Sequence, residues 1–148
     1  MNFLSKFLAT LCFIGLLPFA PGTFGSLAAM LFFVFIKPSL WAHALMLLFT
    51  LLIGTLASHR AEKLFNKKDS RHIVIDEFAG YAVSVILLPA DTAYYIAAFL
   101  LFRFFDILKP PPIRGIERTL SGGIGVMADD IIAGVYTNLL LQAWKHLT

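Results

Sequence analysis

Five of the nine acidic residues lie inside strongly apolar stretches of the sequence. They are Asp76, Glu77, Asp106, Asp129 and Asp130. A buried carboxylate is costly to remove from water, and an adjacent like charge raises that cost. Each acidic pair must therefore face water, be protonated or share a cation. Hard divalent cations such as Mg²⁺ prefer carboxylate oxygens, so metal-assisted chemistry is one function that these residues could perform.

Each acidic pair also has a purely structural interpretation. Asp76 and Glu77, in "HIVIDEFAG" (72–80), could complement the dipole of a helix in its first turn. Asp129 and Asp130 follow the glycine-rich "SGGIG", where one aspartate would suffice to cap the last helix. Consecutive helical residues point about 100° apart, so one aspartate could cap while the other reaches inward. We favour a metal-binding or catalytic role for at least one of this second pair.

Three charges in "RFFDILK" (103–109) recur at every third position. Arg103 and Asp106 share a helix face, and Lys109 lies close to it. They could form an internal salt bridge, with Lys109 reaching the headgroups. Alternatively, Asp106 joins the carboxylate cluster while Arg103 or Lys109 holds a phosphate.

Two glycine-containing stretches give weaker signals. "PGTFGS" (21–26) precedes an apolar segment, and a helix start there could bind an anion or simply be capped by Thr23 or Ser26. "GGIG" (122–125) is expected to break a helix. The single cysteine and the spacing of the histidines give no zinc pattern, and we expect His59 and His72 to lie in a loop.

The composition indicates the elements that must position these groups. The chain is 59% hydrophobic and only 14% charged, whereas soluble domains carry about 25% charged residues. We therefore expect one membrane-embedded domain of 148 residues, 1–148, with no nucleic-acid partner. The net charge of +3 suits anionic headgroups or phosphorylated substrates. We expect the apolar N-terminus to be retained rather than cleaved as a signal peptide.

Six apolar segments predict an all-α polytopic bundle of about five or six helices: roughly 3–17, 24–36, 40–58, 73–88, 92–108 and 128–147. The third, fifth and sixth reach the length of about 17–25 residues that a membrane span needs. The fourth would span only with its acidic end at the interface. The first two are short and could tilt, form a re-entrant pair or lie in the interface.

The basic segments predict the orientation. Residues 59–72 and 109–119 are rich in Lys and Arg, whereas the turns at 37–39 and 89–92 carry one lysine between them. Basic loops remain in the cytoplasm, so the acidic motifs should meet at the cytoplasmic face of the bundle. Ionisable residues within membrane segments are candidates for function.

Four stretches occur in one order between residues 18 and 140: "PGTFGS", "IDEFAG", "FRFFDILKPPPI" and "GGIGVMADDIIAG". Together they resemble the motifs of the bacterial phosphatidylglycerophosphatase A family. The resemblance implies a Mg²⁺-dependent enzyme of the bacterial inner membrane that converts phosphatidylglycerophosphate to phosphatidylglycerol and phosphate. The matching residues are Thr23, Ser26, Asp76, Glu77, Gly80, Arg103, Asp106, Lys109, Pro110, Asp129 and Asp130.

The division of roles among these residues is our own inference. We expect four carboxylates to bind Mg²⁺: Asp76, Glu77, Asp106 and Asp129. Asp130 would be a further ligand or the general base. Two cations, Arg103 and Lys109, would orient the phosphate, and Thr23 and Ser26 would hydrogen-bond to it. The absence of a Cys or His nucleophile motif favours activated water over a covalent intermediate, although an aspartyl-phosphate stays open.

Two other classes of function remain. A phosphatase acting on a different lipid phosphate would use the same groups. An ion-coupled transporter would also use intramembrane carboxylates, but near the midplane and often within internal repeats. The motifs of CDP-alcohol phosphotransferases and of histidine-based lipid phosphatases are absent from the sequence.

Overall fold

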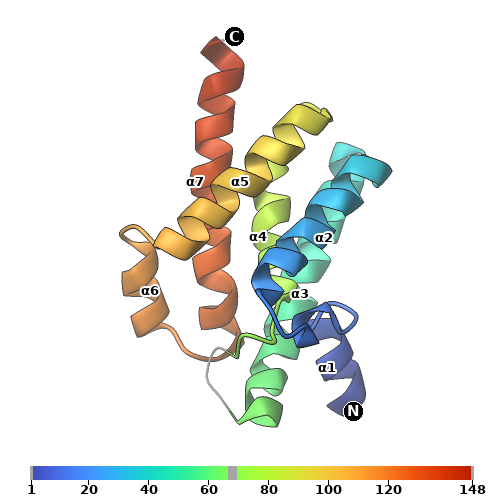
Figure 1. The fold of residues 1–148 in the computed structure, drawn as a ribbon, viewed down its shortest axis with the longest axis vertical. Coiled ribbons are helices and arrows are strands. Elements are labelled where there is room, and N and C mark those ends of the chain that lie inside the picture. Colours follow the sequence, from blue (N-terminus) through green and yellow to red (C-terminus); the bar gives the residue numbers. More distant parts are fainter. Residues whose placement is uncertain (1, 67–69, 148) are drawn as a thin grey trace.

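The computed structural model describes residues 2–66 and 70–147, which form α-helices and one short 3₁₀-helix but no strand (Figure 1). The elements are α1 (Asn2–Ala9), η1 (Ile14–Leu16), α2 (Pro21–Ile36), α3 (Leu40–Phe65), α4 (Ile75–Val85), α5 (Thr92–Leu108), α6 (Ile113–Thr119) and α7 (Gly122–Leu147). The all-α prediction is confirmed. The described residues hold seven α-helices rather than five or six, because the short α6 lies in the basic segment 109–119, outside the six apolar segments.

Helix α4 lies in the middle of the molecule and contacts α2, α3, α5 and α7 (Figure 1). Its buried Tyr81 packs near Phe33 of α2, with ring centroids 5.9 Å apart. The Tyr81 hydroxyl donates a hydrogen bond of 2.8 Å to the carbonyl of Tyr95 on α5. This satisfied polar group inside an apolar cluster fixes α4 relative to α2 and α5.

Glycines allow α4 and α7 to approach closely. A Cβ atom on Gly80 would lie 2.5 Å from the carbonyl oxygen of Asp130 and 2.7 Å from Cε2 of Phe102. A Cβ atom on Gly134 would clash with the carbonyl oxygen of Gly80. The absence of both side chains brings the first turn of α4 beside the acidic turn of α7.

Two helices begin earlier than the apolar pattern predicts. α2 begins at Pro21 and α7 at Gly122, so the expectation that "GGIG" breaks a helix is wrong. The glycines of these first turns allow close contacts: a Cβ on Gly25 would lie 2.9 Å from Cβ of Val74, and one on Gly123 would clash with the carbonyl of Thr55. Close packing thus outweighs the low helix propensity of glycine.

The end of α4 is satisfied by side chains of α7. Asn138 Nδ2 donates to the carbonyls of Ser84 and Ile86 at 3.0 and 2.8 Å, and Gln142 Nε2 donates to Ile86 at 3.3 Å. The last carbonyls of a helix lack partners within it. These amides replace water there, which lets a helix of only 11 residues end among apolar neighbours.

Two of the described helices, α3 and α7, are long and apolar enough to cross a membrane. α5 forms the predicted residues 92–108, but with 17 residues it is too short to count among these candidate membrane spans. The eight residues of α1 rise only about 12 Å, so the first apolar segment is not one continuous helix. Lys67 and Lys68, counted in the basic segment, lie outside the described residues.

Candidate functional site

A polar cavity of about 220 Å³ lies where the first turn of α4, the end of α5 and the second turn of α7 meet. Five carboxylates line it: Asp76, Glu77, Asp106, Asp129 and Asp130. Residues from three helices and separated by up to 54 positions therefore share one space, as the sequence predicted. Lys109, Ser70, Arg71 and Ile73 complete the lining.

The five carboxylates form two groups that share Asp130. In the first, oxygens of Asp76, Glu77 and Asp130 lie within 4.8 Å of one another. In the second, the same holds for Asp106, Asp129 and Asp130. All these donors are oxygens, which is the donor set preferred by hard divalent cations. Asp130 is 3% exposed, so its position between the groups keeps its charge away from bulk water.

Asp129 and Asp130 do not cap α7. The helix begins at Gly122, which places both aspartates about two turns inside it, and they are 7% and 3% exposed. The interpretation of this pair as an N-terminal cap is therefore wrong. By contrast, Asp76 and Glu77 do lie in the first turn of α4, where the helix dipole favours negative charge.

Two cations lie against the carboxylates. Arg103 Nη1 forms a salt bridge with Oδ2 of Asp106, and Lys109 Nζ forms one of 2.7 Å with Oδ2 of Asp129. Lys109 has a φ of 46° at the end of α5 and is followed by Pro110, so the helix stops there. Both predicted cations thus contact the acidic cluster, and acidic groups still outnumber them.

The first turn of α2 covers Glu77. A Cβ atom on Gly22 would clash with Oε1 of Glu77 and lie 3.2 Å from Nη1 of Arg103. Glu77 Oε2 and Arg103 Nε are buried and make no hydrogen bond to any residue that the structure describes. A buried carboxylate oxygen without a hydrogen bond is rare, and a cation ligated there would stabilise it. The donor set therefore fits a divalent ion.

Thr23 and Ser26 occupy a different place from the other predicted residues. Ser26 is fully buried, and its hydroxyl donates to the carbonyl of Gly22 at 2.8 Å. The N-cap of α2 is Ala20, so neither hydroxyl residue caps the helix. Neither residue lines the cavity, and Arg103 does not line it either but pairs with Asp106, which does.

Three residues that line the cavity were not predicted as site residues from the sequence. Ser70, Arg71 and Ile73 line the cavity just before α4, whereas Arg71 was counted only for membrane orientation. This segment is held against the N-terminal region: the Val74 N–H donates to the Ala9 carbonyl at 2.9 Å, and His72 Nδ1 lies 2.8 Å from the Gly15 carbonyl oxygen. Arg71's nearness to Asp76 in the sequence was the available signal. His59 lies within α3, so its assignment to a loop is wrong.

Comparisons with known proteins agree with this set of residues. The family model described as Phosphatidylglycerophosphatase A matches residues 7–145. The phosphatidylglycerophosphatase A of Escherichia coli K12 is 40% identical over 134 residues, which are 89% of this chain and 78% of the relative. The protein of the same name from Haemophilus influenzae is 39% identical over 136 residues, 89% of this chain and 83% of the relative.

A third relative carries another name. A Bacteroides thetaiotaomicron protein provisionally named a phosphatidylinositol-3-phosphatase is 38% identical over 136 residues, 86% of this chain and 84% of the relative. No solved structure matches this chain. The family match covers almost the whole length and includes every residue of the cavity. The chain therefore belongs to the phosphatidylglycerophosphatase A family.

Proposed function

We propose that this phosphatase removes the terminal phosphate of phosphatidylglycerophosphate in a Mg²⁺-dependent reaction, giving phosphatidylglycerol and phosphate for bacterial phospholipid synthesis. The observation that carries the proposal is the position of Asp130 between two carboxylate groups within one cavity. The proposed substrate is the one indicated by the name of two relatives, phosphatidylglycerophosphatase A.

The chain's own residues divide the work in this proposal. Four carboxylates would hold Mg²⁺: Asp76, Glu77, Asp106 and Asp129. When bound, the ion neutralises phosphate charge and activates a water molecule. Asp130 is a further ligand or accepts a proton from the attacking water, because it is the most buried member and touches both groups. Two routes remain open: direct attack by water, and a route through an aspartyl-phosphate. Only the second would allow a phosphorylated aspartate to be trapped.

Lys109 and Arg103 orient the phosphate. Lys109 lines the cavity and pairs with Asp129, so a phosphate there would lie within reach of its ammonium group. Arg103 reaches the site through Asp106 and offers a planar fork of donors. Ser26 acts more indirectly, because its hydroxyl supports the α2 turn at Gly22 that covers Glu77, and Thr23 belongs to the same turn.

The surface of α3 supports a multi-pass placement in the bacterial cytoplasmic membrane. Only 17% of its most apolar 18-residue window is buried, so it is not the core helix of a soluble protein. Seven of its large apolar side chains are more than half exposed: Leu40, Trp41, Leu45, Leu48, Phe49, Leu52 and Leu56. Such a continuous apolar surface is typical of contact with lipid.

The distribution of charge supports a cavity that faces the cytoplasm. The end of the molecule that holds the cavity carries basic residues on α3, on α6 and in the segment before α4 (Figure 1). They are Arg60, Lys63, Arg71, Arg114 and Arg118. The opposite end carries Lys37 and Lys145. A basic excess marks the cytoplasmic side, and it also attracts anionic headgroups.

A second candidate substrate is a phosphoinositide, because one relative is named for a phosphatidylinositol-3-phosphatase. The test is phosphate release by the purified protein in mixed micelles from phosphatidylglycerophosphate, phosphatidylinositol 3-phosphate and glycerol 3-phosphate. The proposal expects the highest kcat/KM for phosphatidylglycerophosphate. A higher value for the phosphoinositide would replace the proposed substrate, and equal values for all three would contradict lipid specificity.

A further inference from the structure

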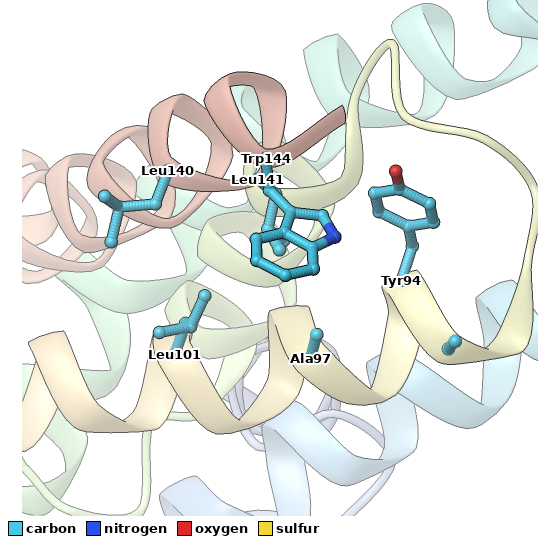
Figure 2. A pocket seen from close by; sticks show the side chains of 7 residues that line it. Tyr94, Ala97, Leu101, Leu140, Leu141 and Trp144 are labelled. Carbon is cyan, nitrogen blue, oxygen red and sulfur yellow. The ribbon is translucent and has the colours of Figure 1, made fainter. Parts of the chain in front are cut away.

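An apolar groove runs between α5 and α7. It encloses about 510 Å³. Figure 2 shows Tyr94, Ala97 and Leu101 on α5 facing Leu140, Leu141 and Trp144 on α7, with the indole of Trp144 in the gap between the two helices. The small side chains of Ala93 and Ala97, one turn apart, leave the space open. No catalytic group lines this groove.

The groove leads toward the carboxylate cavity. A second hollow of about 310 Å³ lies between the same helices and is lined by Phe105, Tyr136, Leu139 and Leu140. Leu140 lines both hollows, so they adjoin. Phe105 directly precedes Asp106, and the Tyr136 hydroxyl donates to the carbonyl of Pro111 at 2.9 Å. An apolar path therefore runs along the two helices that carry Asp106 and Asp130.

The length of this path matches one leaflet of a bilayer. Trp144 follows Asp130 by 14 positions on the same helix, which is a rise of about 21 Å. Half of a bilayer, with its headgroup region included, measures about 20–22 Å. A lipid whose phosphate occupies the cavity at headgroup depth would have its acyl chains beside this path.

We propose that the α5–α7 groove binds one acyl chain of the lipid substrate, an inference that rests on the proposed function. The occupant is an acyl chain rather than a peptide or a second copy of the chain, because the groove is apolar and continues along the same two helices, through the hollow beside Phe105, toward the phosphate cavity. Binding the chain would hold the terminal phosphate at the carboxylates, so acyl length contributes to KM.

The experiment fills the groove and compares two substrates. KM is measured for dipalmitoyl and dihexanoyl phosphatidylglycerophosphate in mixed micelles, with the unmodified protein and with Ala97→Phe. The expected result is an increase of about tenfold in KM for the long-chain substrate with little change for the short-chain one. Tenfold corresponds to about 1.4 kcal/mol, or roughly two methylenes returned from an apolar site.

The matched control is Leu100→Phe, which introduces the same side chain on α5 at a lipid-facing position that is 61% exposed and does not line the groove. It should leave both KM values unchanged. Equal effects of Ala97→Phe on both substrates, or no effect on either, would overturn the inference. If Ala97→Phe does not fold, Ala93→Phe one turn earlier repeats the comparison.

A second measurement uses the unmodified protein. Phosphatidylglycerophosphate with a diazirine near the end of one acyl chain is irradiated with the protein, and the labelled peptides are sequenced. Labelling concentrated on Leu101, Leu140 or Trp144 is expected, whereas labelling spread over α3 as well would show bulk lipid only and overturn the inference. Hydrolysis of neither chain length would instead contradict the proposed function.

Discussion

Gly80 of α4 lies directly against the backbone carbonyl of Asp130 of α7, with room for no side chain between them. This contact places Asp76 and Glu77, one turn earlier on α4, beside the aspartate that both carboxylate groups share. The geometry of the carboxylate cluster therefore depends on a helix contact as much as on the acids themselves.

Gly80→Ala tests this dependence. The added Cβ would lie 2.5 Å from the Asp130 carbonyl oxygen, so α4 and α7 must separate, which costs about 1–3 kcal/mol of stability. A displacement of about 1 Å can lower the rate about a hundredfold. We expect a loss of that order in kcat/KM. The control is Gly115→Ala, where a Cβ meets nothing within 4 Å; similar losses in both variants would contradict the account.

Asp130→Asn removes the charge shared by the two groups while keeping the shape of the side chain. We expect kcat to fall by at least about a hundredfold and Mn²⁺ binding, followed by electron paramagnetic resonance, to weaken by a similar factor. Asp91→Asn is the matched control, since Asp91 caps α5 by accepting from the Ala93 N–H at 2.7 Å and Asn caps about equally well. Unweakened Mn²⁺ binding by Asp130→Asn would remove this residue from the metal site.

Lys109→Gln separates phosphate binding from metal binding. A hydrogen bond to a charged group contributes about 1.5–3 kcal/mol, so we expect kcat/KM to fall by roughly tenfold to a hundredfold. The Mg²⁺ concentration for half-maximal activity should not rise, because the variant removes a cation that competes for Asp129. Lys145→Gln, at the other end of the molecule, should change neither value. A higher Mg²⁺ requirement in Lys109→Gln would show that Lys109 only supports the metal ligands.

Asn138→Leu tests how the short α4 ends. The variant leaves the carbonyl of Ser84 without its amide partner and weakens the hydrogen bonding of Ile86. An unsatisfied buried group costs about 1–3 kcal/mol, which should lower the thermal midpoint measured in detergent. Gln142→Leu should lower it less, because Ile86 keeps the shorter bond from Asn138. The reverse order would show that Gln142 is the main partner.

The sequence predicted some helix limits better than others. Residues 92–108 form α5 as predicted, because Asp91 caps its start and Lys109–Pro110 stop it. α2 and α7 begin several residues earlier than the apolar pattern predicts, because Pro21 and Gly122 are residue types typical of turns. Their conformation is decided by contacts with distant residues such as Val74 and Thr55, which no local pattern reveals.

The candidate site was likewise predictable from the sequence only in part. Acidic residues in apolar surroundings have few stable environments. This constraint, together with the orientation predicted from the basic segments, indicated that five of them meet: Asp76, Glu77, Asp106, Asp129 and Asp130. The place of Ser26 could not be predicted, because it depends on where α2 begins. Ser70 and Arg71 lack an apolar context, so their nearness to Asp76 in the sequence was the one weak signal of their position at the cavity.

The most direct test of the central claim is phosphate release from phosphatidylglycerophosphate by the purified protein, first in excess EDTA and then during a titration with Mg²⁺. The account predicts no release in EDTA and recovery of activity as Mg²⁺ is added, with little recovery in Asp130→Asn. Full activity in EDTA would contradict a role for the carboxylate cluster as a catalytic metal site. No release under either condition from folded protein would contradict the proposed reaction.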